Sequence, residues 1–112
     1  MTKNERFETT VTETLEDIQN LLIIKAKEYR RNDNCYHNFD EGAKLTGNTP
    51  EEVLQGFLLK HLISVSDIRN DIKLGVLPTL EKIEEKYNDI LVYFLIEKAM
   101  IIERLNSNLD DK

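Results

Sequence analysis

The sequence predicts an all-α protein, and three observations lead to this prediction. Apolar residues recur at spacings of three and four in three long segments, which is the periodicity of a helix with one buried face. Helix start and stop signals separate these segments, namely Thr49-Pro50-Glu51-Glu52, Gly47 and Leu74-Gly75. The run at 90–96 could be a buried strand by itself, but its flanks contain helix formers and neither Gly nor Pro. We therefore expect a bundle of three long helices plus one short helix.

The first helix is predicted over about residues 4–31. Its apolar positions fall on one side of a helix, and they are Phe7, Val11, Leu15, Ile18, Leu22, Ala26 and Tyr29. The short polar side chains of Asn32-Asp33-Asn34 compete for backbone hydrogen bonds and tolerate turn conformations. They should end this helix.

A short helix is expected over about 39–46, anchored by Phe39 and ended by Gly47. The next helix should begin at Pro50 and end near Leu74-Gly75. Its predicted core stripe consists of Leu54, Leu58, Leu62, Val65, Ile68 and Ile72.

The last helix is predicted from Pro78, in its first turn, to about Asn106, followed by a polar tail at 107–112 that should fray. Around residues 90–96 this helix is apolar on all sides, so it must be covered on all sides. One copy of so small a bundle leaves part of that surface exposed. We therefore expect a homodimer or higher homo-oligomer, with a subunit contact at or near Val92, Phe94, Leu95 or Ile96.

The chain has 112 residues and 40% hydrophobic content, which suits a single domain over 1–112 with an ordered core at about 5–106. Its 21 acidic and 15 basic residues give a net charge of −6, which opposes binding to a nucleic-acid backbone. The longest apolar run is far shorter than the roughly 20 residues of a membrane span. A lone Cys35 and no apolar leader favour a cytoplasmic location.

The most plausible chemistry lies near the start of the last helix. Glu85, Asp89 and Tyr93 recur every four residues, so they share one side of the helix beside an uncharged segment. Carboxylates gathered next to a core need a cation, a proton or a basic partner. Mg²⁺ commonly takes one or two protein carboxylates plus substrate phosphates. The alternative is a solvated acidic face near a helix N-terminus, where the dipole favours negative charge.

The preceding helix carries a second polar stripe, formed by Lys60, Ser64, Asp67 and Asp71, with His61 beside it. If the two helices pack antiparallel, Asp67 could approach Glu85 or Asp89, and Lys60 or His61 could contact an anionic substrate. The alternative is a stripe that forms salt bridges with neighbouring helices.

Other motifs are less informative. Cys35 and His37 are too few for a structural zinc site, which normally has four ligands. There is no glycine-rich phosphate loop, and spacing singles out no Ser, His and acid arrangement.

Several short segments in order resemble a protein family. They are Lys27-Glu28-Tyr29, then Asn34 with His37-Asn38-Phe39-Asp40, then Lys60-His61-Leu62-Ile63-Ser64-Val65 with Asp67, then Glu84-Glu85 with Asp89 and Tyr93. Together they look like a family of small bacteriophage proteins that is similar to the nucleotide-modification-associated and MazG-like all-α nucleotide pyrophosphatases.

The resemblance implies Mg²⁺-dependent cleavage of a nucleoside triphosphate between its α and β phosphates, in the host cytoplasm if the protein is phage-encoded. It assigns the catalytic and metal-binding roles to Glu85, Asp89 and Asp67, with Glu28 as a further metal ligand. It also implies phosphate contacts from Lys60 and His61, and nucleotide contacts from Asn38 and Tyr93. The chain departs from the family pattern in one respect, because the expected first pair of glutamates three apart is replaced by Asp67 and Asp71, four apart.

Two hypotheses follow. The first is a MazG-like nucleoside triphosphate pyrophosphohydrolase or nucleotide-binding protein that uses Mg²⁺. The second is a non-enzymatic, acidic, oligomeric phage protein that binds a host or phage protein through its last helix.

Overall fold

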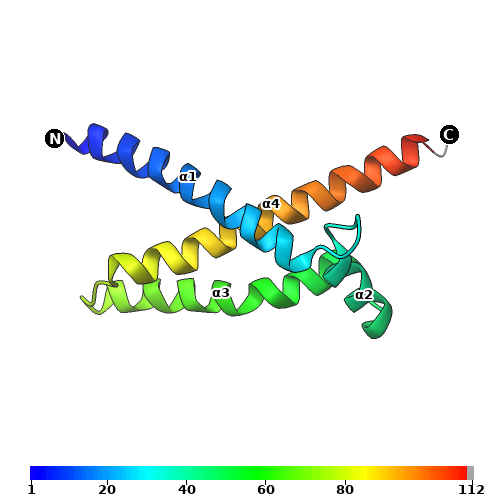
Figure 1. The fold of residues 1–112 in the computed structure, drawn as a ribbon. Coiled ribbons are helices and arrows are strands. Elements are labelled where there is room, and N and C mark those ends of the chain that lie inside the picture. The colour runs from blue at the N-terminus through cyan, green and yellow to red at the C-terminus, as the bar shows by residue number, and fades with distance from the viewer. Residues whose placement is uncertain (111–112) are drawn as a thin grey trace.

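The computed structural model describes residues 1–110 and consists of four helices: α1 (Lys3–Tyr29), α2 (His37–Thr46), α3 (Pro50–Lys73) and α4 (Leu80–Asp110). The predicted all-α fold of three long helices and one short helix is confirmed. Figure 1 shows α3 and α4 running antiparallel, α1 crossing α4, and α2 beside the start of α3.

Local capping chemistry explains where α2 ends and α3 begins. Gly47 follows α2 with a φ of 73°, the left-handed conformation that favours glycine. Thr49 Oγ1 then accepts a hydrogen bond from the Glu52 amide (3.2 Å), and Glu52 Oε1 accepts one from the Thr49 amide (3.1 Å). This reciprocal pair, with Pro50 in the first turn, is the capping box that the sequence predicts.

The ends of α4 differ from the prediction. Thr79 Oγ1 accepts a hydrogen bond from the Lys82 amide (3.2 Å), so Thr79 caps the helix and Pro78 lies before it. At the other end the helix continues to Asp110, and residues 107–110 of the predicted polar tail are helical. The rest of that tail, 111–112, lies outside the described residues.

The core is one apolar cluster to which all four helices contribute. Its buried members are Ile18, Tyr29, Phe39, Leu54, Leu58, Val92, Tyr93, Ile96 and Met100. Phe39 is fully buried, and its ring meets the Tyr29 ring at a steep angle with the centroids 4.9 Å apart. The predicted anchoring role of Phe39 is confirmed.

The buried stripe of α3 differs from the predicted stripe at two positions. Leu62 and Ile72 are exposed, whereas His61 is buried together with Leu54, Leu58, Val65 and Ile68. These positions are spaced four, three, four and three, so the stripe is centred on a polar residue. A prediction that follows apolar residues alone chooses the neighbouring leucine.

Of the four residues predicted for a subunit contact, Val92 and Ile96 are instead buried within the chain itself. Phe94 and Leu95 remain exposed. The two pairs differ because Val92 and Ile96 belong to the core cluster, whereas Phe94 and Leu95 line an open apolar groove beside α1.

The chain is elongated, with principal dimensions of 53 × 29 × 25 Å and a radius of gyration of 17.1 Å. The N-terminal half of α1 and the C-terminal end of α4 project from opposite ends of the bundle (Figure 1). Phe7, Val11 and Leu15, predicted for the core face of α1, are exposed because this half diverges from α4. Within residues 1–110, no helix combines the length and apolarity required to cross a bilayer.

Candidate functional site

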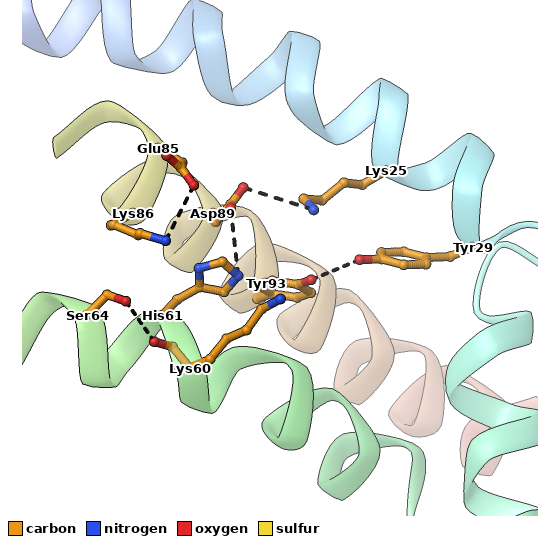
Figure 2. A network of polar contacts seen from close by, with 9 residues as sticks. All are labelled: Lys25, Tyr29, Lys60, His61, Ser64, Glu85, Lys86, Asp89 and Tyr93. Carbon is orange, nitrogen blue, oxygen red and sulfur yellow. Dashed lines mark hydrogen bonds and ion pairs between the residues drawn. The ribbon is translucent and has the colours of Figure 1, made fainter. Parts of the chain in front are cut away.

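A buried histidine and an aspartate face each other between α3 and α4. His61 Nε2 lies 3.6 Å from Asp89 Oδ2, and the two side chains are 8% and 18% exposed. Both lie on the inner stripes of their helices, which is why the antiparallel packing of α3 and α4 brings them together. Lys25 approaches the same carboxylate from α1, with Nζ 4.0 Å from Asp89 Oδ1 (Figure 2).

The environment of His61 favours the neutral form of its imidazole. Burial lowers the pKa of His61, and the ammonium groups of Lys60, Lys86 and Lys25 also lower it, against the opposing effect of the Asp89 carboxylate. A neutral ring that donates its Nε2 hydrogen toward Asp89 has an acceptor lone pair on Nδ1. This Nδ1 atom is buried and has no hydrogen-bond partner among the described residues.

Two tyrosines form the aromatic side of the site. The hydroxyl groups of Tyr29 on α1 and Tyr93 on α4 are hydrogen-bonded at 3.0 Å, and both residues are buried. Burial raises the pKa of Tyr29, and the hydrogen bond with Tyr93 raises it further. The Lys25 ammonium lies 5.1 Å from the centroid of the Tyr93 ring and 6.0 Å from that of Tyr29. A half-buried cation is thus held by two ring faces and one carboxylate.

Three lysines from three different helices surround the histidine. Lys25, Lys60 and Lys86 belong to α1, α3 and α4, and each is close enough to lower the pKa of His61. We call them the lysine cluster. In Figure 2, Lys60 extends from α3 toward Tyr93, and Lys86 lies beside His61 with Nζ 3.4 Å from Glu85 Oε1.

The lysine cluster is a local excess of positive charge in an acidic protein. Lys25 faces the Asp89 carboxylate and Lys86 pairs with Glu85, which is 62% exposed, whereas Lys60 extends toward Tyr93. Lysines gathered around a neutral histidine and a tyrosine hydroxyl are suited to binding an anion that carries several oxygen atoms.

The structure brings only part of the predicted metal site together. Asp89 faces the interior, whereas Glu85 is exposed and pairs with Lys86. Asp67 lies on the solvent side of α3, and Glu28 is exposed on α1. Within residues 1–110, no three Asp, Glu, His or Cys side chains are grouped closely enough to hold a metal ion.

The predicted substrate-binding residues also divide into two groups. His61, Lys60 and Tyr93 come together around Asp89. The ring centroids of His61 and Tyr93 are 5.7 Å apart. Asn38 is exposed in the first turn of α2 and forms none of the hydrogen bonds of this site among the described residues.

Sequence reasoning missed Lys25 and Lys86 as site residues. Lys25 does carry a signal, because it continues the inner stripe of α1 from Ile18 and Leu22 to Tyr29 at spacings of four, three and four. A cation on an apolar stripe needs a carboxylate or an aromatic partner from another helix.

Comparisons of the chain with models of protein families, with curated proteins and with solved structures find no match.

Proposed function

We propose that this protein binds a nucleotide through its phosphate groups at the lysine cluster, as a non-hydrolysing relative of the MazG-like proteins that its sequence resembles. The observation that carries the proposal is the position of three lysines, from three helices, around buried His61: Lys25 also contacts Asp89, and the charge of each lysine lowers the pKa of His61. The order of sequence motifs, which include Lys60 and His61, is the reason for proposing a nucleotide as the ligand.

The charges of the site suit a polyphosphate. Lys25 is held by Asp89, while Lys60 and Lys86 have exposed or partly exposed side chains that can each donate to a phosphate oxygen. Lys86 only has to exchange the exposed Glu85 for the ligand. Such an exposed ion pair contributes little, about 0–1 kcal/mol, so the exchange is inexpensive.

His61 adds a pH dependence to binding. A phosphate beside the ring supplies negative charge that opposes the effect of the three lysines, so it raises the pKa of His61. By linkage, the affinity for the anion should increase as the pH falls below 6.5, the ordinary pKa of histidine.

The arrangement does not fit a magnesium site built from protein carboxylates. The only inward carboxylate of the predicted set, Asp89, is already shared by Lys25 and His61, and the carboxylates of Glu85, Asp67 and Glu28 are exposed. Magnesium-dependent hydrolysis, the activity implied by the resemblance, stays a prediction. Nucleotide binding requires only the cations that are in place.

Calorimetric titration tests the proposal, with a deoxynucleoside triphosphate, a ribonucleoside triphosphate and inorganic pyrophosphate as ligands, each with and without Mg²⁺. Lys60→Met and Lys86→Met remove one charge and keep the length of the side chain. Each should weaken binding about 5- to 10-fold, the loss of one charge-assisted contact at the surface. Lys44→Met is the matched control, because Lys44 is exposed on α2 and pairs locally with Glu41. No binding by any of the ligands, or equal losses in all three variants, would contradict the proposal.

Product analysis by anion-exchange chromatography addresses hydrolysis separately. We expect the triphosphate to remain intact with Mg²⁺ present. Release of pyrophosphate that is lost in Asp89→Asn would instead support the pyrophosphohydrolase hypothesis.

A further inference from the structure

α4 carries a second apolar face, opposite to the one that packs in the core. Its inner face presents Val92, Ile96 and Met100. Seven apolar or aromatic residues, at spacings typical of one helix face, occupy the other side. We call them the outer stripe, and they are Leu80, Ile83, Tyr87, Leu91, Phe94, Ile101 and Leu105. All except Tyr87 are exposed.

The N-terminal half of α1 carries apolar residues on the face that it shares with buried Ile18. Phe7 is 68% and Leu15 is 63% exposed, because the N-terminal half of α1 points away from α4 (Figure 1). The divergence leaves an apolar groove between the two helices, lined by Leu15, Ile18, Leu91, Phe94, Leu95 and Lys98. A second groove continues along the start of α4, where Leu80 and Ile83 lie across from the polar residues Glu13 and Asp17 of α1.

The surface of the single chain is too large for a compact monomer. Its accessible area is 8468 Å², whereas a monomer of 13.1 kDa should expose roughly 6,400 Å². Its radius of gyration is 17.1 Å, compared with about 13 Å for a compact chain of this length. The excess area is roughly 2,000 Å², and a stable interface needs about 800–1,000 Å² from each partner.

We propose that a second copy of this chain covers the outer stripe and the N-terminal half of α1. In an isologous pair, the α1 half of each copy packs along the outer stripe of the other, because a two-fold axis repeats each contact. The excess area is sufficient for this partner without any rearrangement of the core. Asp89 lies on the inner face of α4 and not in the outer stripe, so this partner does not cover it.

Sedimentation velocity on the full chain tests the dimer. The wild-type protein should sediment with twice the mass of a 13.1 kDa chain. Leu91→Glu and Phe94→Glu place a charge in the middle of the outer stripe, and each should weaken the dimer at least about 30-fold, as expected for a central interface residue. Leu45→Glu is the matched control, because Leu45 is 87% exposed on α2, outside both surfaces. It should remain a dimer.

Far-UV circular dichroism keeps the test independent of folding. Both stripe variants should retain the wild-type helical signal, because the replaced side chains are exposed in the single chain. A wild-type protein that stays monomeric at concentrations up to about 50 µM, which corresponds to a dissociation free energy weaker than roughly 6 kcal/mol, would overturn the proposal. So would a dimer that neither stripe variant weakens more than Leu45→Glu does.

Discussion

The hydrogen bond between Tyr29 and Tyr93 permits a sharp test of the site, because each hydroxyl can be removed without removing its ring. The two hydroxyl oxygens are 3.0 Å apart, and the two residues are 8% and 5% exposed. Tyr93→Phe leaves the Tyr29 hydroxyl buried without that partner, and Tyr29→Phe does the same to Tyr93. The contacts of Lys25 with both ring faces are preserved in either variant.

The expected magnitudes follow from the cost of an unsatisfied buried hydroxyl, about 1–3 kcal/mol. Each single variant should lower the free energy of unfolding by about 1.5 kcal/mol. The double variant buries no orphaned hydroxyl and should lose only about 1 kcal/mol, far less than the sum of the single losses. The implied coupling energy is about 2 kcal/mol. For a chain of 112 residues, each single loss corresponds to a decrease in Tm of roughly 6 °C.

Urea unfolding at pH 7, followed by circular dichroism at one fixed protein concentration, measures all four free energies. A fixed concentration is required because association changes the apparent stability. A double variant that loses the full sum of the single losses would refute the reasoning, because the two hydroxyls would then act independently. A spectrophotometric titration supplies a second readout. The pKa of Tyr29 should remain raised by burial in Tyr93→Phe, but less than in the wild type.

Three further predictions concern stability. The pKa of His61 is lowered in the folded chain, so the unfolded chain binds more protons below pH 6.5. The free energy of unfolding should therefore decrease as the pH falls from 6.5. His61→Gln should flatten this dependence in urea titrations at several pH values. Gly47→Ala should lower the free energy of unfolding by about 1 kcal/mol, because φ is 73° at this position. Gly56→Ala, inside α3 with open space around the new Cβ, should raise it by about 0.5–1 kcal/mol. Thermal melts in which both variants shift Tm in the same direction would contradict this. Phe39→Ala should cost about 3–5 kcal/mol in urea unfolding, because the fully buried ring contacts those of Tyr29 and Phe57; a loss below 1 kcal/mol would place this residue outside the core.

The helices could be predicted from the sequence because their signals are local. The capping box at Thr49, the left-handed Gly47 and the spacing of apolar residues all act within a few positions along the chain. The divergence of α1 from α4 could not be predicted in this way. It depends on which parts of two long stripes meet, and the stripe from Phe7 to Tyr29 is equally apolar before and after the crossing.

The candidate site could be predicted only where one helix determines it. Asp89 and Tyr93 share the inner face of α4, as their spacing indicates. The same rule could have placed Asp67 away from this face, because it is two positions after Val65, about 200° around α3. The pairing of Lys25 with Asp89 joins residues 64 positions apart. Such a contact depends on how α1 lies against the hairpin of α3 and α4, and no local pattern specifies it.

Asp89 links the site to the packing of the whole bundle. A half-buried carboxylate on an apolar stripe is costly unless it is paired, and its partners Lys25 and His61 come from two other helices. Asp89 therefore favours one placement of α1 against α3 and α4, and this placement also brings the three lysines together.

A phosphate that contacts all three lysines should stabilise the same placement. Because the N-terminal half of α1 belongs to the proposed dimer surface, nucleotide binding and dimerisation should strengthen each other. Linkage requires this effect to be reciprocal. Because the dimer holds two sites, a saturating triphosphate should tighten the dimer by the square of the factor by which each site of the dimer binds the triphosphate more tightly than the monomer does. Sedimentation with and without the triphosphate measures the first factor, and titration of wild-type protein and Phe94→Glu measures the second. A saturating triphosphate that leaves the affinity of the dimer unchanged would show that α1 does not couple the two surfaces.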